Sequence, residues 1–108
     1  SYGLRLESGD GRVLAYSGDT AYCDALVELA VGADVLLCEA SWTHEEGRPP
    51  GIHMSGSEAG LTARRAGVGR LVLTHIPPWT DHEAVRAEAA AEFDGEIVLG
   101  VAGATFDV

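Results

Sequence analysis

Residues 13–20 have the sequence Val-Leu-Ala-Tyr-Ser-Gly-Asp-Thr, in which an apolar stretch stops at a Gly-Asp-Thr turn. The apolar part predicts a strand, and apolar residues with helical spacing follow it, so a helix is expected over 22–31. Asp19 then lies between the carboxyl end of a strand and the start of a helix. In open α/β sheets the loops at that edge converge, and ligands collect there.

The residues before this stretch predict an antiparallel hairpin. Apolar and polar residues alternate from Tyr2 to Glu7, which is typical of a half-buried strand. Ser8-Gly9-Asp10-Gly11 then provides a turn, because Asp-Gly between two strand-like stretches favours a tight hairpin. Residues 12–17 are therefore expected to pair antiparallel with the first strand.

Strands and helices alternate after the hairpin. Apolar stretches predict strands over 34–39, 70–74 and 96–101. Two capping-box sequences precede the helical stretches between them, namely Ser55-Gly-Ser-Glu58 and Thr80-Asp-His-Glu83. This order predicts an α/β fold with a mostly parallel sheet, an opening antiparallel hairpin and helices on one face. The other face would be left apolar and bare, so it would need a partner.

Composition limits the classes of protein. A chain of 108 residues with 46% hydrophobic residues has the size and core of one modest domain. The formal net charge is −10 and there is no lysine, which disfavours a large nucleic acid as the partner. No apolar stretch is long enough to span a membrane and no signal segment opens the chain, so the expected localisation is cytoplasmic. Because the chain begins with Ser1, we expect the natural protein to continue upstream.

Candidate metal ligands fall at the ends of the predicted strands. Asp19, Glu39, His53 and His75 each lie at or after the carboxyl end of a strand, where a parallel sheet would bring them together. Aspartate and histidine suit zinc, iron or manganese, and a carboxylate can bridge two such ions that activate water for hydrolysis.

Structural roles are the alternative for each of these residues. Asp19 could cap the following helix, Glu39 could be a solvated strand end, and His53 could be a loop residue without a partner. His75 could stack in a rigid turn made by the prolines that follow it.

The two tryptophans and the two cysteines also leave choices open. Trp42 and Trp79 follow Glu39 and His75 closely, so they could wall a substrate pocket, although ordinary core packing explains them equally well. Cys23 and Cys38 lack the spacing of a metal or redox motif, so buried, reduced thiols are expected.

Four segments occur in an order that resembles a known family. They are Ser17-Gly-Asp-Thr20, Cys38-Glu-Ala-Ser41, His53-Met-Ser55 and Leu71-Val-Leu-Thr-His75. Together they are similar to the C-terminal half of a metallo-β-lactamase-fold hydrolase, in the branch of ribonuclease Z and related phosphodiesterases. The resemblance implies that residues 1–108 are the C-terminal half of an αββα sandwich, in which two sheets pack face to face with helices outside.

The resemblance also implies roles for single residues. Asp19 would bridge two divalent metal ions, usually zinc with manganese or iron as alternatives, and His75 would bind one of them. A metal-bridging hydroxide would attack a phosphodiester, with His53 as general acid or phosphate clamp and Glu39 orienting it.

Two departures from the family limit what the chain can do alone. The His-x-His-x-Asp-His motif of the family belongs to the N-terminal half and is absent here, so the chain alone is expected to be inactive. Ile-Pro-Pro-Trp79 follows His75 in place of the residues typical of ribonuclease Z, which weakens a role in tRNA processing. The expected partner is therefore the missing half, or a second copy bound through the apolar sheet face, and the expected substrate is a small-molecule or nucleotide phosphodiester.

Two other functions stay open. The same fold could cleave a lactone, a thioester or a sulfate ester, because one metal site serves several chemistries. Alternatively, the chain could be a non-enzymatic α/β association module whose acids and histidines only cap helices and line an interface.

Overall fold

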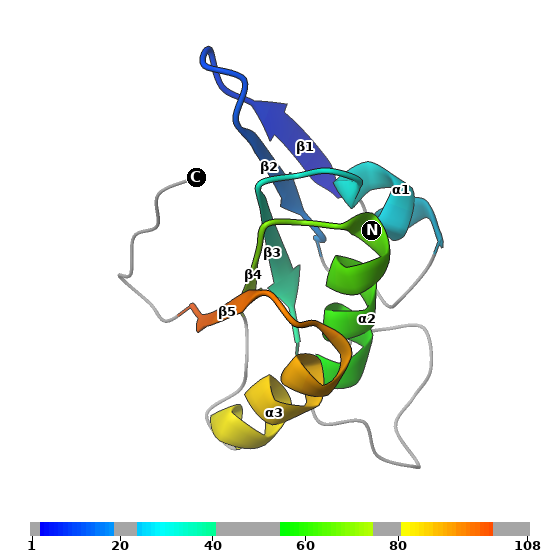
Figure 1. The fold of residues 1–108 in the computed structure, drawn as a ribbon, viewed down its shortest axis with the longest axis vertical. Helices are drawn as coiled ribbons and strands as arrows, with labels where there is room; N and C mark the ends of the chain where they lie inside the picture. The colour runs from blue at the N-terminus through cyan, green and yellow to red at the C-terminus, as the bar shows by residue number, and fades with distance from the viewer. Residues whose placement is uncertain (1–2, 19–23, 41–54, 75–80, 101–108) are drawn as a thin grey trace.

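The computed structural model describes residues 3–18, 24–40, 55–74 and 81–100, which form an α/β fold with one five-stranded sheet (Figure 1). The strands are β1 (Leu4–Glu7), β2 (Val13–Tyr16), β3 (Val35–Glu39), β4 (Arg70–Thr74) and β5 (Glu96–Leu99). The helices are α1 (Asp24–Ala30), α2 (Gly56–Ala66) and α3 (His82–Glu92). The strand order in the sheet follows the order in the chain.

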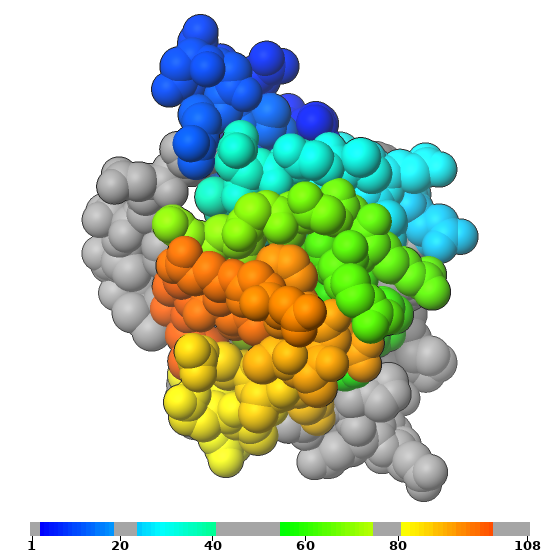
Figure 2. All heavy atoms as spheres, in the orientation of Figure 1, coloured from blue at the N-terminus to red at the C-terminus, as the bar shows by residue number. Residues whose placement is uncertain are grey.

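The opening hairpin is confirmed. β1 and β2 pair antiparallel, with Leu4 opposite Tyr16 and Glu7 opposite Val13. The turn between them closes through a 2.8 Å hydrogen bond from the Ser8 N–H to the Arg12 carbonyl oxygen, and Gly11 has a φ of 85°. A positive φ is costly for any residue with a Cβ atom, which explains the glycine at this position of the turn. The hairpin projects from one end of the molecule (Figure 2).

The rest of the sheet is parallel, as the alternation of strands and helices predicts. β2 pairs with β3, β3 with β4 and β4 with β5, all in parallel. The strand order moves in one direction across the sheet, and the helices gather on one face, as the right-handed crossover rule predicts for that order (Figure 1). Parallel strands joined in this way bring their carboxyl ends to a single edge.

The helix caps confirm one prediction and correct another. Ser55 and Glu58 form the predicted capping box: Ser55 Oγ accepts from the Glu58 N–H at 3.2 Å, and Glu58 Oε1 accepts from the Ser55 N–H at 3.0 Å. For α3 the predicted cap at Thr80 is wrong, because the N-cap is Asp81. Its carboxylate accepts from the N–H groups of Glu83 and Ala84, and this charged acceptor satisfies two amides at once.

The core lies between the helices and the sheet. Alternate strand residues point into it, which is the two-residue period of a strand; they are Ala15, Leu36, Cys38, Leu71 and Leu73. α2 approaches α3 very closely at Gly60, where an added Cβ atom would lie only 2.5 Å from the Ala89 carbonyl oxygen. The small residue therefore sets the distance between these helices.

The opposite face of the sheet is only partly bare, which corrects the expectation of an entirely exposed face. In its centre Val35 is 3% exposed and Val72 is 0% exposed. Toward the hairpin, Leu4 is 54% exposed and Leu6 is 58% exposed. The side chain of Arg5 reaches carbonyl oxygens at the end of α1 on the helix side, so its neighbours in β1 point the other way.

We call the exposed and half-buried apolar residues of β1, β2 and β3 on this side the hairpin face. Its members are Leu4, Leu6, Leu14, Tyr16 and Leu37.

Candidate functional site

Glu39 is the predicted site residue that lies within the described parts of the chain. Asp19, Trp42, His53, His75 and Trp79 lie outside the described residues, and so does the predicted start of the helix over 22–31. Asp19 directly follows the described Gly18, and His75 directly follows the last residue of β4. The described ends of β2 and β4 therefore show where the chain continues into Asp19 and His75.

The ends of β2 and β4 lie at the edge of the sheet where the parallel strands end. Glu39, the last residue of β3, pairs with Thr74, the last residue of β4. On the other side of β3, the Ser17 N–H donates to the Leu37 carbonyl oxygen at 2.9 Å. Neighbouring strands are about 4.8 Å apart, so the ends of β2 and β4 are about 10 Å apart across β3. Glu39 thus lies between the strand ends that precede Asp19 and His75.

Glu39 is buried rather than solvated. Its residue is 4% exposed, which excludes the alternative of a solvated strand end. The phenolic hydroxyl of Tyr16 donates a hydrogen bond to Glu39 Oε1, with 3.3 Å between the oxygens. A buried carboxylate is expensive unless it accepts hydrogen bonds, so this side chain is held in place rather than left at a surface.

Ser17 ties the Glu39 backbone to the end of β2. Its Oγ accepts from the Glu39 N–H at 3.1 Å and donates to the Gly18 carbonyl oxygen at 2.9 Å. Gly18 has a φ of 65°, so the chain turns out of the strand at this point. One buried hydroxyl therefore connects the β3 backbone to the turn that precedes Asp19.

The contacts of Tyr16 and Ser17 to Glu39 were not predicted from the sequence. A signal for them exists, since both residues immediately precede the Gly-Asp-Thr turn at the end of β2. Their partner, however, is more than 20 residues away in the chain, and only the pairing of β2 with β3 makes the contacts possible.

Replacing Ser17 with alanine is expected to lower the free energy of unfolding by about 1 to 3 kcal/mol, because the buried Glu39 N–H loses its acceptor. Urea unfolding of the two proteins measures this difference. Ser57→Ala is the matched control, since Ser57 donates to Glu88 Oε1 through its backbone N–H, which alanine keeps. If both variants unfold at the same urea concentration, the Ser17 hydroxyl does not stabilise the strand end.

Cys38 is a buried, reduced thiol, as predicted, whereas Cys23 lies outside the described residues. Burial raises the pKa of the Cys38 thiol to about 12, against a smaller lowering by a hydrogen bond with Ser17. Such a thiol stays protonated near neutral pH, and the thiolate is the form that attacks and binds metals. Cys38 is therefore a core residue.

Two candidate metal donors follow the described strand ends in the sequence. Within the described ranges, no cluster of three or more histidine, cysteine or acidic residues could hold an ion. The residues that follow the ends of β2 and β4 are nevertheless suitable donors, since Asp19 offers a carboxylate and His75 an imidazole. The donor types at this edge of the sheet thus fit a divalent ion, although two donors are fewer than a complete site needs.

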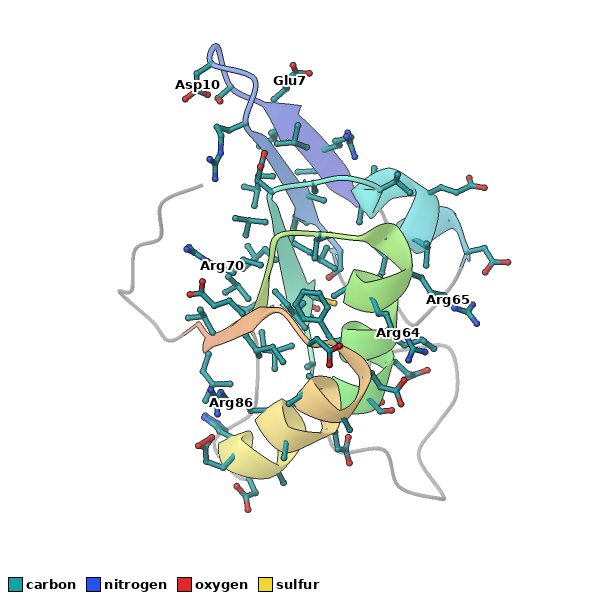
Figure 3. The ribbon with its side chains drawn as sticks, viewed as in Figure 1. Glu7, Asp10, Arg64, Arg65, Arg70 and Arg86 are labelled. Carbon is teal, nitrogen blue, oxygen red and sulfur yellow. The ribbon has the colours of Figure 1, made fainter. Side chains whose placement is uncertain are left out.

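The arginines of the described residues do not gather into one basic surface. Figure 3 shows Arg64 and Arg65 on α2 pointing away from Arg70 on β4 and Arg86 on α3. Two of these side chains also lie beside acids, with Arg64 3.3 Å from Glu92 and Arg70 3.3 Å from Glu96.

Among the described segments, we find no helix with the length and the apolar character that a membrane span requires.

A comparison with protein families identifies the fold. The model of the β-lactamase superfamily domain matches residues 1–76. The chain belongs to this family. The crystal structure of the metallo-β-lactamase fold protein YhfI from Bacillus subtilis superposes with a TM-score of 0.84 at 31% identity, covering 92% of this chain and 41% of YhfI. The metallo-β-lactamase fold expected from the four segments is thereby confirmed.

Two curated relatives extend the comparison. An uncharacterized protein of Mycobacterium leprae, ML1173, is 61% identical over all 108 residues, which are 38% of its length. Ribonuclease Z of Thermobifida fusca is 41% identical over 90% of this chain and 34% of its own length. Relatives of this metallo-β-lactamase-fold chain thus include hydrolases, and the chain spans between 34% and 41% of the length of the relatives named here.

Proposed function

We propose that this chain is the C-terminal part of a metal-dependent hydrolase that cleaves a phosphodiester. Residues 1–108 would form the C-terminal half of a metallo-β-lactamase-fold domain, and the N-terminal half would supply the other metal ligands. Family membership supports this proposal, as does the similarity to a ribonuclease Z and to YhfI of Bacillus subtilis, which is named a probable metallo-hydrolase. The partial coverage of these relatives supports the missing half.

The observation that carries the proposal is the placement of Glu39. A buried carboxylate, hydrogen-bonded by Tyr16, lies between two parallel strand ends that are followed by Asp19 and His75. An acid in the interior of a small domain is uncommon unless it is paired or used in chemistry. This edge of the sheet is also where open α/β folds place their ligands.

The residues would divide the work between metal binding and proton transfer. Asp19 and His75 would hold two divalent ions, zinc with manganese or iron as alternatives, which when bound supply a nucleophile at neutral pH and neutralise charge on the phosphate. His53 would donate a proton to the leaving oxygen or clamp the phosphate. Glu39 would fix the His53 ring and favour its protonated form. Trp42 and Trp79 would wall the substrate pocket.

The proposed substrate class follows from charge. The net charge of −10 repels a long phosphate backbone, so a small-molecule or nucleotide diester fits better than a large nucleic acid. The proposed location is the cytoplasm, where a soluble nucleotide diester is available.

The test is a substrate panel with the full-length protein, with metal per protein measured by inductively coupled plasma mass spectrometry. We expect turnover of bis(p-nitrophenyl) phosphate or a nucleotide diester, loss of turnover after chelation, and recovery on adding zinc or manganese. Turnover confined to lactones, thioesters or sulfate esters would refute the phosphodiester assignment. A full-length protein with neither metal nor turnover would instead favour the association module.

A further inference from the structure

We propose that Tyr16 is a positioning residue, whose phenol orients the Glu39 carboxylate toward its catalytic partner. The inference rests on the proposed function, in which Glu39 acts by fixing His53. It adds to that function a residue on a different strand, three positions before Asp19 in the sequence.

The register of the sheet explains how Tyr16 reaches Glu39. Tyr16 lies beside Leu37 in the parallel pair of β2 and β3, and Glu39 is two residues further along β3 on the same face. The long phenol side chain therefore extends along the sheet toward the end of β3, and its hydroxyl lies 3.3 Å from Glu39 Oε1. A shorter hydroxyl side chain at position 16 could not span that step.

The backbone of Glu39 is already fixed from both neighbouring strands. Ser17 Oγ accepts from the Glu39 N–H at 3.1 Å on the β2 side. On the β4 side, the Ala40 N–H donates to the Thr74 carbonyl oxygen at 3.1 Å. The freedom left to Glu39 lies in its side-chain torsions, which are among the most costly to order. The Tyr16 hydroxyl restrains those torsions through its hydrogen bond to Oε1, so it contributes to where the carboxylate points.

The chemistry of the donor suits an orienting role. An arginine in place of Tyr16 would also hold the carboxylate, but its positive charge would cancel the negative charge that Glu39 offers to a second partner. A phenol donates a hydrogen bond while remaining neutral, so the carboxylate keeps its charge for an imidazolium. Replacing buried ionic groups by apolar residues often leaves stability unchanged or improved. A buried glutamate held by a neutral donor therefore indicates a use beyond stability.

The experiment compares Tyr16→Phe with the wild-type, full-length protein on the diester that it cleaves best. Phenylalanine keeps the ring and removes only the hydroxyl. We expect kcat to fall about 10- to 100-fold, the range that corresponds to the loss of one hydrogen bond to a charged group, with KM and metal per protein nearly unchanged. The unfolding midpoint should fall as well, because the buried Glu39 side chain loses a donor. A purely structural tyrosine would change the unfolding midpoint and leave kcat at its wild-type value.

Thr62→Val is the matched control. It removes another buried hydroxyl, which donates to the Glu58 carbonyl oxygen at 2.8 Å within α2. This variant is expected to unfold more easily than the wild type and to keep its kcat. The control therefore separates the effect of losing a buried hydroxyl from the effect of losing orientation at Glu39.

A double-mutant cycle with Glu39→Ala decides whether Tyr16 acts through Glu39. In the Glu39→Ala background, Tyr16→Phe should cause no further loss of kcat. Independent, additive losses would overturn the inference, and so would wild-type kcat in Tyr16→Phe. Those results would leave the proposed function intact if His53→Ala lowers kcat by about 100-fold or more. A wild-type protein that cleaves no phosphodiester would overturn the proposed function and the role of Tyr16 together.

Discussion

Replacing His53 with alanine in the full-length protein is expected to lower kcat for a phosphodiester by about 10²- to 10⁴-fold, the range typical of a general acid. Metal per protein should stay at the wild-type value, because Asp19 and His75 are the proposed ligands and His53 is not one of them. The measurements are steady-state turnover and elemental analysis of the same preparation. Their combination distinguishes a lost proton donor from a lost metal site.

The nature of the leaving group sharpens this prediction. A general acid matters most when the leaving oxygen is strongly basic, since such an oxygen departs poorly without a proton. The defect of His53→Ala should therefore be large for an alkyl or nucleoside diester and smaller for bis(p-nitrophenyl) phosphate, whose leaving group is stable as an anion. An equal defect on both substrates would favour the alternative of a phosphate clamp.

His44→Ala is the control for this substitution. His44 stands beside Glu45 and Glu46 in the sequence, and no role in the proposed site is assigned to it. The variant is expected to turn over substrate at the wild-type rate. Wild-type turnover of every phosphodiester by His53→Ala would contradict the proposed mechanism, whereas loss of metal from His53→Ala would make His53 a ligand.

Much of the fold could be predicted because its signals are local. The hairpin follows from a period of two and an Asp-Gly turn, and α2 begins at a capping box whose two side chains are three residues apart. The cap of α3 was misplaced by one residue because Thr80 and Asp81 are both good caps. The capping-box pattern favoured Thr80, whereas in the structure the Asp81 carboxylate accepts from two amides.

The site was only partly predictable because its contacts cross between strands. The position of Glu39 at the end of a strand was evident in the sequence, and its burial was not. Its contacts depend on the pairing of β2 with β3, which brings Tyr16 and Ser17 beside Glu39. Likewise, the periodicity of single strands could not indicate that Val35 and Val72 are covered while the hairpin face is exposed.

The 108-residue chain expressed by itself is expected to associate through the hairpin face. Leu4 and Leu6 are more than half exposed there, beside half-buried apolar residues of β2 and β3. Covering about 400 Å² of apolar surface would contribute about 10 kcal/mol at about 25 cal/mol/Å², before the entropic cost of association. At micromolar concentration, light scattering should therefore give at least twice the monomer mass, with metal per protein near zero.

Charge substitutions test whether the hairpin face is the surface involved. The double variant Leu4→Asp and Leu6→Asp should give a monomer, because both side chains would carry unpaired charge into the contact. Val31→Asp is the matched control, since Val31 is 53% exposed but lies just after α1, outside the hairpin face. It should associate as the unmodified chain does.

In the full-length protein the same two substitutions are expected to lower the free energy of unfolding. If the N-terminal half covers the hairpin face, Leu4→Asp and Leu6→Asp would place charges in a buried interface. They should then destabilise the full-length protein by several kcal/mol. The isolated chain should stay folded, because its hairpin face is open to solvent. Val31→Asp should change the unfolding free energy of either form by less than about 0.5 kcal/mol. A monodisperse monomer from the unmodified chain would contradict self-association, and equal stability of the full-length variants would show that this face stays open to solvent.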